Sequence, residues 1–116
     1  MDISTLAEEL GLGEEEVRRL LVTFLDSTEQ DLVLLSRAFS DRDAEKLRAT
    51  AHHIKGAAAS LELSEIAEAA LAIEEKTRSG IIEDPAARIA RIKNRLNIIR
   101  TQLSLKEQNH GCSDIP

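Results

Sequence analysis

The sequence predicts an all-α protein, an antiparallel four-helix bundle with a short N-terminal helix packed across one end. Only Phe24 and Phe39 are aromatic among the 116 residues. A core of Leu, Ile, Val and Ala favours helices, because strands draw on aromatic and β-branched side chains. Apolar residues also recur at helical spacing along most of the chain. Capping and helix-breaking residues interrupt that spacing too often for one long coiled-coil rod, so short connections between antiparallel helices are expected.

The first two helices are predicted from the residues at their ends. The first covers about residues 3–10, because Gly11 is typical of the position after a helix C-terminus. The second begins near Glu14, where three consecutive glutamates favour the positive end of the helix dipole, and it ends near Phe39. Both phenylalanines are expected in the core. The apolar positions that give the second helix its period are Val17, Leu20, Leu21, Phe24, Leu32, Leu35 and Phe39.

The three later helices are predicted in the same way. Residues 40–43 offer N-cap side chains for a third helix, which runs to about Leu61. Ser64 is the expected N-cap of a fourth helix that ends at Gly80. An Asp-Pro pair at 84–85 is typical of an N-cap and the first helical position, so a fifth helix starts there. The apolar stripes of the last two helices are Ile66, Ala70, Ile73 and Thr77, then Ile89, Ile92, Leu96, Ile99 and Leu103.

Composition limits the domain organisation and the class of function. The chain is long enough for one core, so residues 1–105 form a single helical domain, and residues 106–116, which are polar and lack a period, form a C-terminal tail. The net charge of −6 disfavours nucleic acid, which binds basic surfaces. No apolar run approaches the roughly 20 residues that span a bilayer, and no N-terminal secretion signal is present. We therefore expect a cytoplasmic protein that binds neither nucleic acid nor membrane.

The third predicted helix presents a histidine on its outward face. At 100° per residue, His52 lies opposite the core face, and His53 lies about a quarter-turn away, at the boundary between core and solvent. The two side chains diverge too far to chelate one metal ion, and the lone Cys112 can form neither an internal disulfide nor a zinc cluster. The expected core face consists of Leu47, Thr50, Ile54, Ala57, Ala58 and Leu61.

The residues around His52 suit an exposed nucleophile whose product is an anion. Ala49, Gly56 and Ala59 are small, so the imidazole stands above a low surface that a partner protein can approach. Gly56 lies in the middle of the helix, where Gly costs about 1 kcal/mol relative to Ala. Lys55 places a cation beside His52, which suits an added phosphoryl group of about −1.5 to −2 charges.

The segment Ala51–Gly56, with the sequence AHHIKG, resembles the A-H-x-[LI]-K-G motif of histidine phosphotransfer (HPt) domains of bacterial and fungal phosphorelays. The resemblance covers roughly residues 12–103. It implies that His52 is the phosphorylated residue. It also implies that Lys55 neutralises the phosphoryl group and that Gly56 provides clearance for the partner.

Two positions depart from the family pattern. Glu62 stands where the family usually has a glycine, which leaves open the shape of the junction between the third and fourth helices. Glu74 stands where several members have a glutamine hydrogen-bonded to the inner ring nitrogen of the histidine. A glutamate can accept the same Nδ1–H bond and would leave Nε2 of His52 free as the nucleophile. The alternative is that Glu74 is a solvated helix residue.

The resemblance implies a phosphoryl carrier without kinase or phosphatase activity of its own. His52 would attack the aspartyl phosphate of a receiver domain, which belongs to a response regulator or a hybrid histidine kinase, and the reverse step would pass the group to another receiver. The sequence has no carboxylate cluster for Mg²⁺ and no glycine-rich nucleotide loop, so we expect no cofactor in this chain and Mg²⁺ supplied by the partner. A monomer is expected.

Two other classes of function stay open from the sequence. One is a non-catalytic helical adaptor in which His52 is incidental, although an adaptor would not need Lys55 and Gly56 around that histidine. The other is a dimeric phosphotransferase or a kinase dimerisation fragment, which would carry Glu or Asp directly after the histidine, where this chain has His53. Met1 and the polar C-terminal end favour a protein that stands alone. The cognate kinase, the receivers and the direction of phosphoryl flow do not follow from the sequence.

Overall fold

A computed structural model describes the backbone of residues 2–113 and the side chains of residues 2–104. Within the described residues every regular element is a helix, and no strand is present. The prediction of an all-α fold is confirmed. No described helix is long and apolar enough to cross a membrane. The helices are α1 (Ile3–Leu10), α2 (Glu14–Ser40), α3 (Ala44–Ser60), α4 (Ser64–Arg78) and α5 (Ala86–Ser113).

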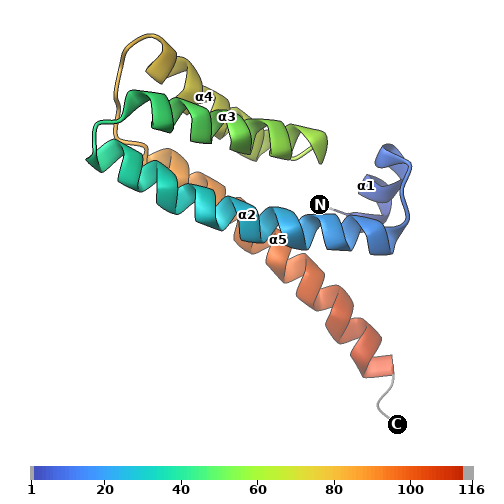
Figure 1. The fold of residues 1–116 in the computed structure, drawn as a ribbon. Coiled ribbons are helices and arrows are strands. Elements are labelled where there is room, and N and C mark those ends of the chain that lie inside the picture. Colours follow the sequence, from blue (N-terminus) through green and yellow to red (C-terminus); the bar gives the residue numbers. More distant parts are fainter. Residues whose placement is uncertain (1, 114–116) are drawn as a thin grey trace.

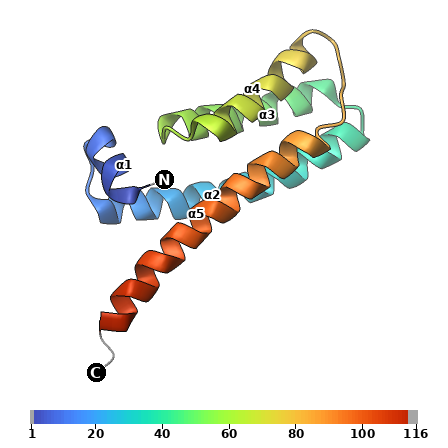
Figure 2. The same cartoon turned by 180° about the vertical axis from the view of Figure 1, so that it is seen from behind.

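Four helices form a closed ring, in which α2 packs on α3, α3 on α4, α4 on α5, and α5 on α2. Successive helices run in opposite directions, as Figures 1 and 2 show from opposite sides. The short helix α1 packs against α2 and lies at the end of the bundle where α2 begins. The predicted four-helix bundle with an N-terminal helix at one end is therefore confirmed.

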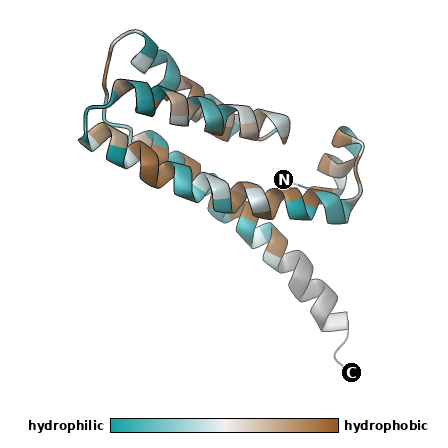
Figure 3. Cartoon of the chain, in the orientation of Figure 1, coloured by the Kyte–Doolittle hydropathy of each residue, from teal (hydrophilic) through white to brown (hydrophobic). Residues whose placement is uncertain are grey.

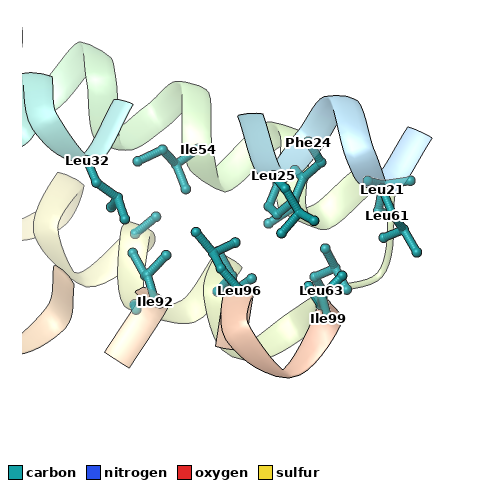
Figure 4. Close-up of a cluster of buried hydrophobic side chains, with 14 of the residues drawn as sticks. Leu21, Phe24, Leu25, Leu32, Ile54, Leu61, Leu63, Ile92, Leu96 and Ile99 are labelled. Atoms are coloured by element: carbon teal, nitrogen blue, oxygen red, sulfur yellow. The ribbon is translucent and has the colours of Figure 1, made fainter. Parts of the chain in front are cut away.

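The core lies along the centre of this ring. Brown apolar positions recur along each helix in Figure 3, between teal polar ones. Figure 4 shows Phe24 and Leu25 of α2 on the opposite side of the core from Leu96 and Ile99 of α5. Every residue of the apolar stripes predicted for α4 and α5 is buried. Because burying one Leu or Ile side chain contributes about 1.5–3 kcal/mol, these stripes drive the helices together.

The core face of α2 differs in part from the prediction. Leu20 is 42% exposed, because it lies at the edge of the buried arc, while Leu25 and Thr28 are buried within that arc. Phe39 is only half-buried, because it sits one residue before the end of α2. The guanidinium of Arg42 covers its ring, with its carbon 4.6 Å from the ring centroid. Such cation–π contacts contribute about 0.5–1 kcal/mol at exposed sites.

The predicted N-cap is correct for α3, whereas the predicted starts of α4 and α5 each miss by one residue. The side chain of Asp43 accepts a hydrogen bond from the backbone N–H of Lys46 at 3.0 Å. Helix α5 begins at Ala86 and not at Pro85, although the side chain of Asp84 accepts from the N–H of Ala86 at 3.0 Å and so caps this end as predicted. Ser64 is the first residue of α4 itself, and the residue before it makes no side-chain cap hydrogen bond.

The predicted ends of the last two helices were also inaccurate. Helix α4 ends at Arg78, two residues before the expected Gly80, which instead adopts the left-handed conformation just beyond the helix end. Helix α5 continues past residue 105 to Ser113, so the backbone of residues 106–113 is helical where a tail was predicted. The side chains of residues 105–116, Cys112 among them, lie outside the described residues.

The junction between α3 and α4 keeps a regular helix-ending geometry despite Glu62. The N–H of Leu63 donates to Ala58 O at 2.8 Å, and the N–H of Glu62 donates to Ala59 O at 3.0 Å. These two bonds define a Schellman motif, which needs a left-handed residue at the position of Glu62. Glu62 adopts that conformation, with φ of 58°. The chain therefore makes the turn that a glycine would favour, with a residue that is strained there.

Candidate functional site

His52 lies on the outward face of α3, and its side chain is 61% exposed. The opposite face of the helix is buried, as the helical periodicity predicted, and it includes Leu47, Thr50 and Ile54. Ala51 is fully buried as well, while Ala57, which was predicted in the core, is only half-buried. The helical period therefore accounts both for the packed core face of α3 and for the exposed imidazole on its opposite face.

Glu74 of α4 holds the inner nitrogen of the His52 ring. Glu74 Oε2 lies 2.7 Å from His52 Nδ1, and the Glu74 side chain has no exposed surface. An ionised carboxylate can only accept, so Nδ1–H of His52 donates this bond. The tautomer follows from the partner, and it leaves the Nε2 lone pair of an exposed ring free. Glu74 is thus a buried partner of His52 and not a solvated helix residue.

Two cations complete the surroundings of the Glu74 carboxylate. Lys55 Nζ lies 2.9 Å from Oε1 as an ion pair, although Oε1 accepts no well-aligned hydrogen bond. Arg78 Nη2 donates to Oε2 at 3.1 Å, from one turn further along α4. Burial raises the pKa of Glu74, but its contacts with Lys55 and His52 outweigh burial and hold the pKa below its ordinary value. The carboxylate is therefore charged, and its charge is compensated within the site.

Arg78 is a site residue that the sequence did not reveal. Its side chain is 63% exposed and reaches the same oxygen that accepts from His52. The one signal in the sequence is its spacing, because residues four apart on a helix face one another and an acid followed by a base forms a favourable pair. That pattern occurs on many surface helices, so it becomes informative only when Glu74 is known to be buried.

Gly56 is exposed, and nothing in the described residues requires a glycine there. A Cβ atom added to Gly56 would meet nothing within 4 Å, and the residue lies within the regular helix α3. A glycine in a helix interior costs about 0.5–1 kcal/mol relative to alanine. This fold has no use for the missing methyl group, which supports the expected role in clearance for another molecule.

His53 makes a second contact of similar length, with a different helix. Its Nδ1 lies 2.7 Å from Asp31 Oδ2 of α2, and its side chain is 60% exposed. Asp31 is 14% exposed, and among the described residues no Lys or Arg forms an ion pair with it. The prediction placed His53 at the boundary between core and solvent but did not provide this partner.

The described residues contain no group of three or more His, Cys, Asp or Glu side chains that could hold a metal ion. The carboxylate of Glu74 is already matched by His52, Lys55 and Arg78. The arrangement around His52 can therefore present a nucleophilic nitrogen to solvent, with cations beside it. This is the chemistry of an acceptor for an anionic group that a partner delivers.

Comparison with known proteins agrees with this chemistry. The model of the Hpt domain family matches residues 19–102, which include the whole of α3 and α4. Among solved structures, the chain is similar to the crystal structure of histidine-containing phosphotransfer protein B (HptB) from Pseudomonas aeruginosa PAO1. The two share 29% sequence identity with a TM-score of 0.78, over 94% of this chain and 95% of that chain. Curated protein sequences provide no significant match. The chain therefore belongs to the Hpt domain family, the phosphoryl carriers of two-component phosphorelays, and is not a standalone kinase.

Proposed function

We propose that this protein carries the phosphoryl group on Nε2 of His52, taking it from the aspartyl phosphate of one receiver domain and giving it to another. One observation carries the assignment. The buried carboxylate of Glu74 accepts from Nδ1–H of His52 at 2.7 Å, which leaves Nε2 as the nucleophile on a ring that is 61% exposed. Hpt domains interact with receiver domains, and we assign these receivers to a response regulator or a hybrid histidine kinase.

The neighbouring histidine provides an internal comparison. His52 and His53 are almost equally exposed, and each Nδ1 lies 2.7 Å from a carboxylate oxygen. They differ in what surrounds that carboxylate. Glu74 is fully buried and paired with two cations, whereas Asp31 is partly exposed and pairs with no Lys or Arg among the described residues. A phosphoryl group on His52 would lie close to the two cations that pair with Glu74, whereas the carboxylate partner of His53 brings no such cations among the described residues, which favours His52.

Lys55 and Arg78 are the groups that would meet the phosphoryl group. Lys55 follows His52 by one turn of α3, and its side chain is 29% exposed, so its ammonium can reach outward as well as inward. The guanidinium of Arg78 already lies largely in solvent. Each can form a charge-assisted hydrogen bond with a group of about −1.5 to −2 charges. We assign neutralisation of the phosphoryl group to Lys55, with Arg78 assisting.

The transfer itself depends on positioning and charge more than on acid–base chemistry. The Nε2 lone pair forms the N–P bond while the P–O bond to the receiver aspartate breaks, and the bonding pair leaves with the carboxylate. Gly56 provides the clearance for the receiver. In our proposal Mg²⁺ is supplied by the receiver domain, the carrier has no cofactor of its own, and it works as a monomer in the cytoplasm.

Transfer from a radiolabelled phosphorylated receiver domain tests the assignment. The native chain is expected to take up label that is labile in acid and stable in alkali, as phosphohistidine is. His52→Gln is expected to abolish uptake, and the matched variant His53→Gln to retain it. Label on His52→Gln that is absent from His53→Gln would show that the site is misassigned. No label on any variant from several receivers would favour a non-catalytic adaptor.

A further inference from the structure

The charge of Glu74 has a consequence for the phosphorylated protein, and this inference rests on the proposed role of His52. A glutamine at position 74 could accept the same hydrogen bond from Nδ1–H. A carboxylate also stabilises positive charge on the ring, as the buried acid of a Ser-His-Asp triad does for its imidazolium. The distance of 2.7 Å and the complete burial of Glu74 place that charge against Nδ1 with no water between them.

The protonation state of the His52 ring in each step of the transfer determines when the charge of Glu74 matters. When neutral His52, protonated on Nδ1, attacks through Nε2, the new N–P bond makes the ring cationic while no proton moves. When the group leaves, the P–N bond breaks and its electron pair returns to Nε2. If Nδ1 is still protonated, the leaving group is neutral imidazole. If that proton has been lost to solvent, the leaving group is an imidazolate anion, which leaves far less readily.

We propose that the Glu74 carboxylate keeps Nδ1 of phosphorylated His52 protonated, so that the phosphoryl group stays ready to transfer at and above neutral pH. Glu74 is thus a positioning residue that acts through His52 and does not touch the phosphoryl group. Glu74 thus determines how readily the phosphoryl group leaves His52, in addition to fixing the orientation of the imidazole ring.

The other charged groups near His52 and Glu74 are compatible with this role of the carboxylate. Lys55 from α3 and Arg78 from α4 contact the carboxylate and partly offset its charge in the unphosphorylated protein. On α2, Asp31 contacts His53 and not His52. Both cations could also pair with an arriving phosphoryl group, and this would weaken their contacts with Glu74. The carboxylate then acts mainly on Nδ1–H, and the charge on the ring is best supported in the state that has to release the group.

Titration of the phosphorylated ring tests the proposal. The chain, labelled with ¹⁵N-histidine, is phosphorylated with phosphoramidate, and the Nδ1 signal of phosphorylated His52 is followed by NMR from about pH 5 to about pH 10, a range that brackets histidine titration. Because an opposite charge within a few ångströms moves a titration midpoint by about 1–3 pH units, Glu74→Gln is expected to lower the midpoint by about one pH unit or more. Above both midpoints, the rate of phosphoryl transfer to a receiver is expected to fall about tenfold for each pH unit by which the midpoint is lowered.

Asp31→Asn is the matched control, because it also turns a histidine-bound carboxylate into an amide. It is expected to leave the His52 midpoint unchanged. Equal midpoints in the native chain and Glu74→Gln would overturn the proposal, and so would a uniform slowing at every pH with an unchanged midpoint, which would reduce Glu74 to an orienting role. Phosphorylation of a histidine other than His52, or of none, would overturn the proposed function and this inference with it.

A second measurement avoids any dependence on how well Glu74→Gln folds. The midpoint of phosphorylated His52 in the folded native chain is compared with that of the same chain unfolded in urea. The proposal requires the folded value to be higher by about one pH unit or more, because unfolding removes Glu74 from Nδ1. A folded midpoint equal to or below the unfolded one would overturn it.

Discussion

Glu74 is a charged side chain with no exposed surface, and three donors from two helices compensate its buried charge. His52 and Lys55 come from α3, and Arg78 comes from α4 itself. An isolated buried carboxylate would cost several kcal/mol, and pairing is what makes it tolerable. Through these contacts Glu74 couples the electrostatics of the site to the packing of α3 on α4.

This coupling predicts a specific acid sensitivity. The pKa of Glu74 is below its ordinary value of 4.5 in the folded chain. Its contribution to the free energy of unfolding is therefore complete above that value and is lost as pH falls through the lower, folded value. Urea unfolding of the native chain and Glu74→Gln, from neutral pH to well below the ordinary glutamate pKa, measures this. The native chain should lose more stability than the variant below pH 4.5, and parallel losses would contradict the prediction.

Replacing Gly56 by alanine is expected to stabilise the fold and to slow phosphoryl transfer from a receiver. Because a Cβ atom meets nothing within 4 Å, Gly56→Ala is expected to raise the free energy of unfolding by about 0.5–1 kcal/mol. In the proposed transfer the same methyl group would stand on the surface that the receiver approaches, so transfer from a receiver should slow more than phosphorylation by phosphoramidate. Thermal unfolding and the two rates check this. Equal slowing with both donors would argue against a role in clearance.

At the scale of the elements, four helices end in the same way with different residues. Helices α1, α2, α3 and α4 each close with a Schellman motif, in which a left-handed residue lies just beyond the helix. That residue is Gly11 after α1 and Gly80 after α4, but it is Arg42 after α2 and Glu62 after α3. Glu62 also has an unfavourable electrostatic environment. Its contact with the Glu9 carboxyl group, together with some desolvation, raises its pKa.

These ends predict a matched series of substitutions. Glu62→Gly is expected to raise the Tm by a few degrees, because glycine adopts the left-handed conformation without strain and the contact with Glu9 disappears. Gly80→Ala is expected to lower the Tm by roughly 4–8 °C, the reverse change at the equivalent position. Arg42→Gly should gain less than Glu62→Gly, because it also loses the contact with Phe39. Calorimetry measures all three, and no gain for Glu62→Gly would contradict the strain argument.

Across the whole molecule, local signals in the sequence were sufficient for the architecture. Capping residues such as Asp43 and Asp84, together with the apolar stripes of α4 and α5, place most helices and their core faces correctly. The errors fall where local signals are ambiguous. Ser64 suits an N-cap and a first helical residue equally well, and the exposure of Leu20 depends on how far the neighbouring helices reach along α2.

The site was predictable to the extent that it lies on one helix. His52, Lys55 and Gly56 fall within one segment of α3, so helical geometry and a family resemblance place them together. Glu74 needed the resemblance, because its contact with His52 depends on how α4 packs. Arg78 and the partner of His53 were missed for the same reason. Contacts between helices depend on the rotation of each helix about its own axis, which the apolar stripes define only to within a broad arc.

That rotation is fixed more tightly for α3 than its apolar face alone requires. His52 and His53 leave the helix about 100° apart, and they bind α4 and α2 respectively, each at 2.7 Å. If α3 rolled in either direction, one of these two bonds would lengthen. Neither imidazole has to be immobilised when a receiver docks, so less conformational entropy is lost at that moment. In the proposed transfer, the angle from which the receiver aspartate would meet Nε2 is thereby determined by helix packing before any partner arrives.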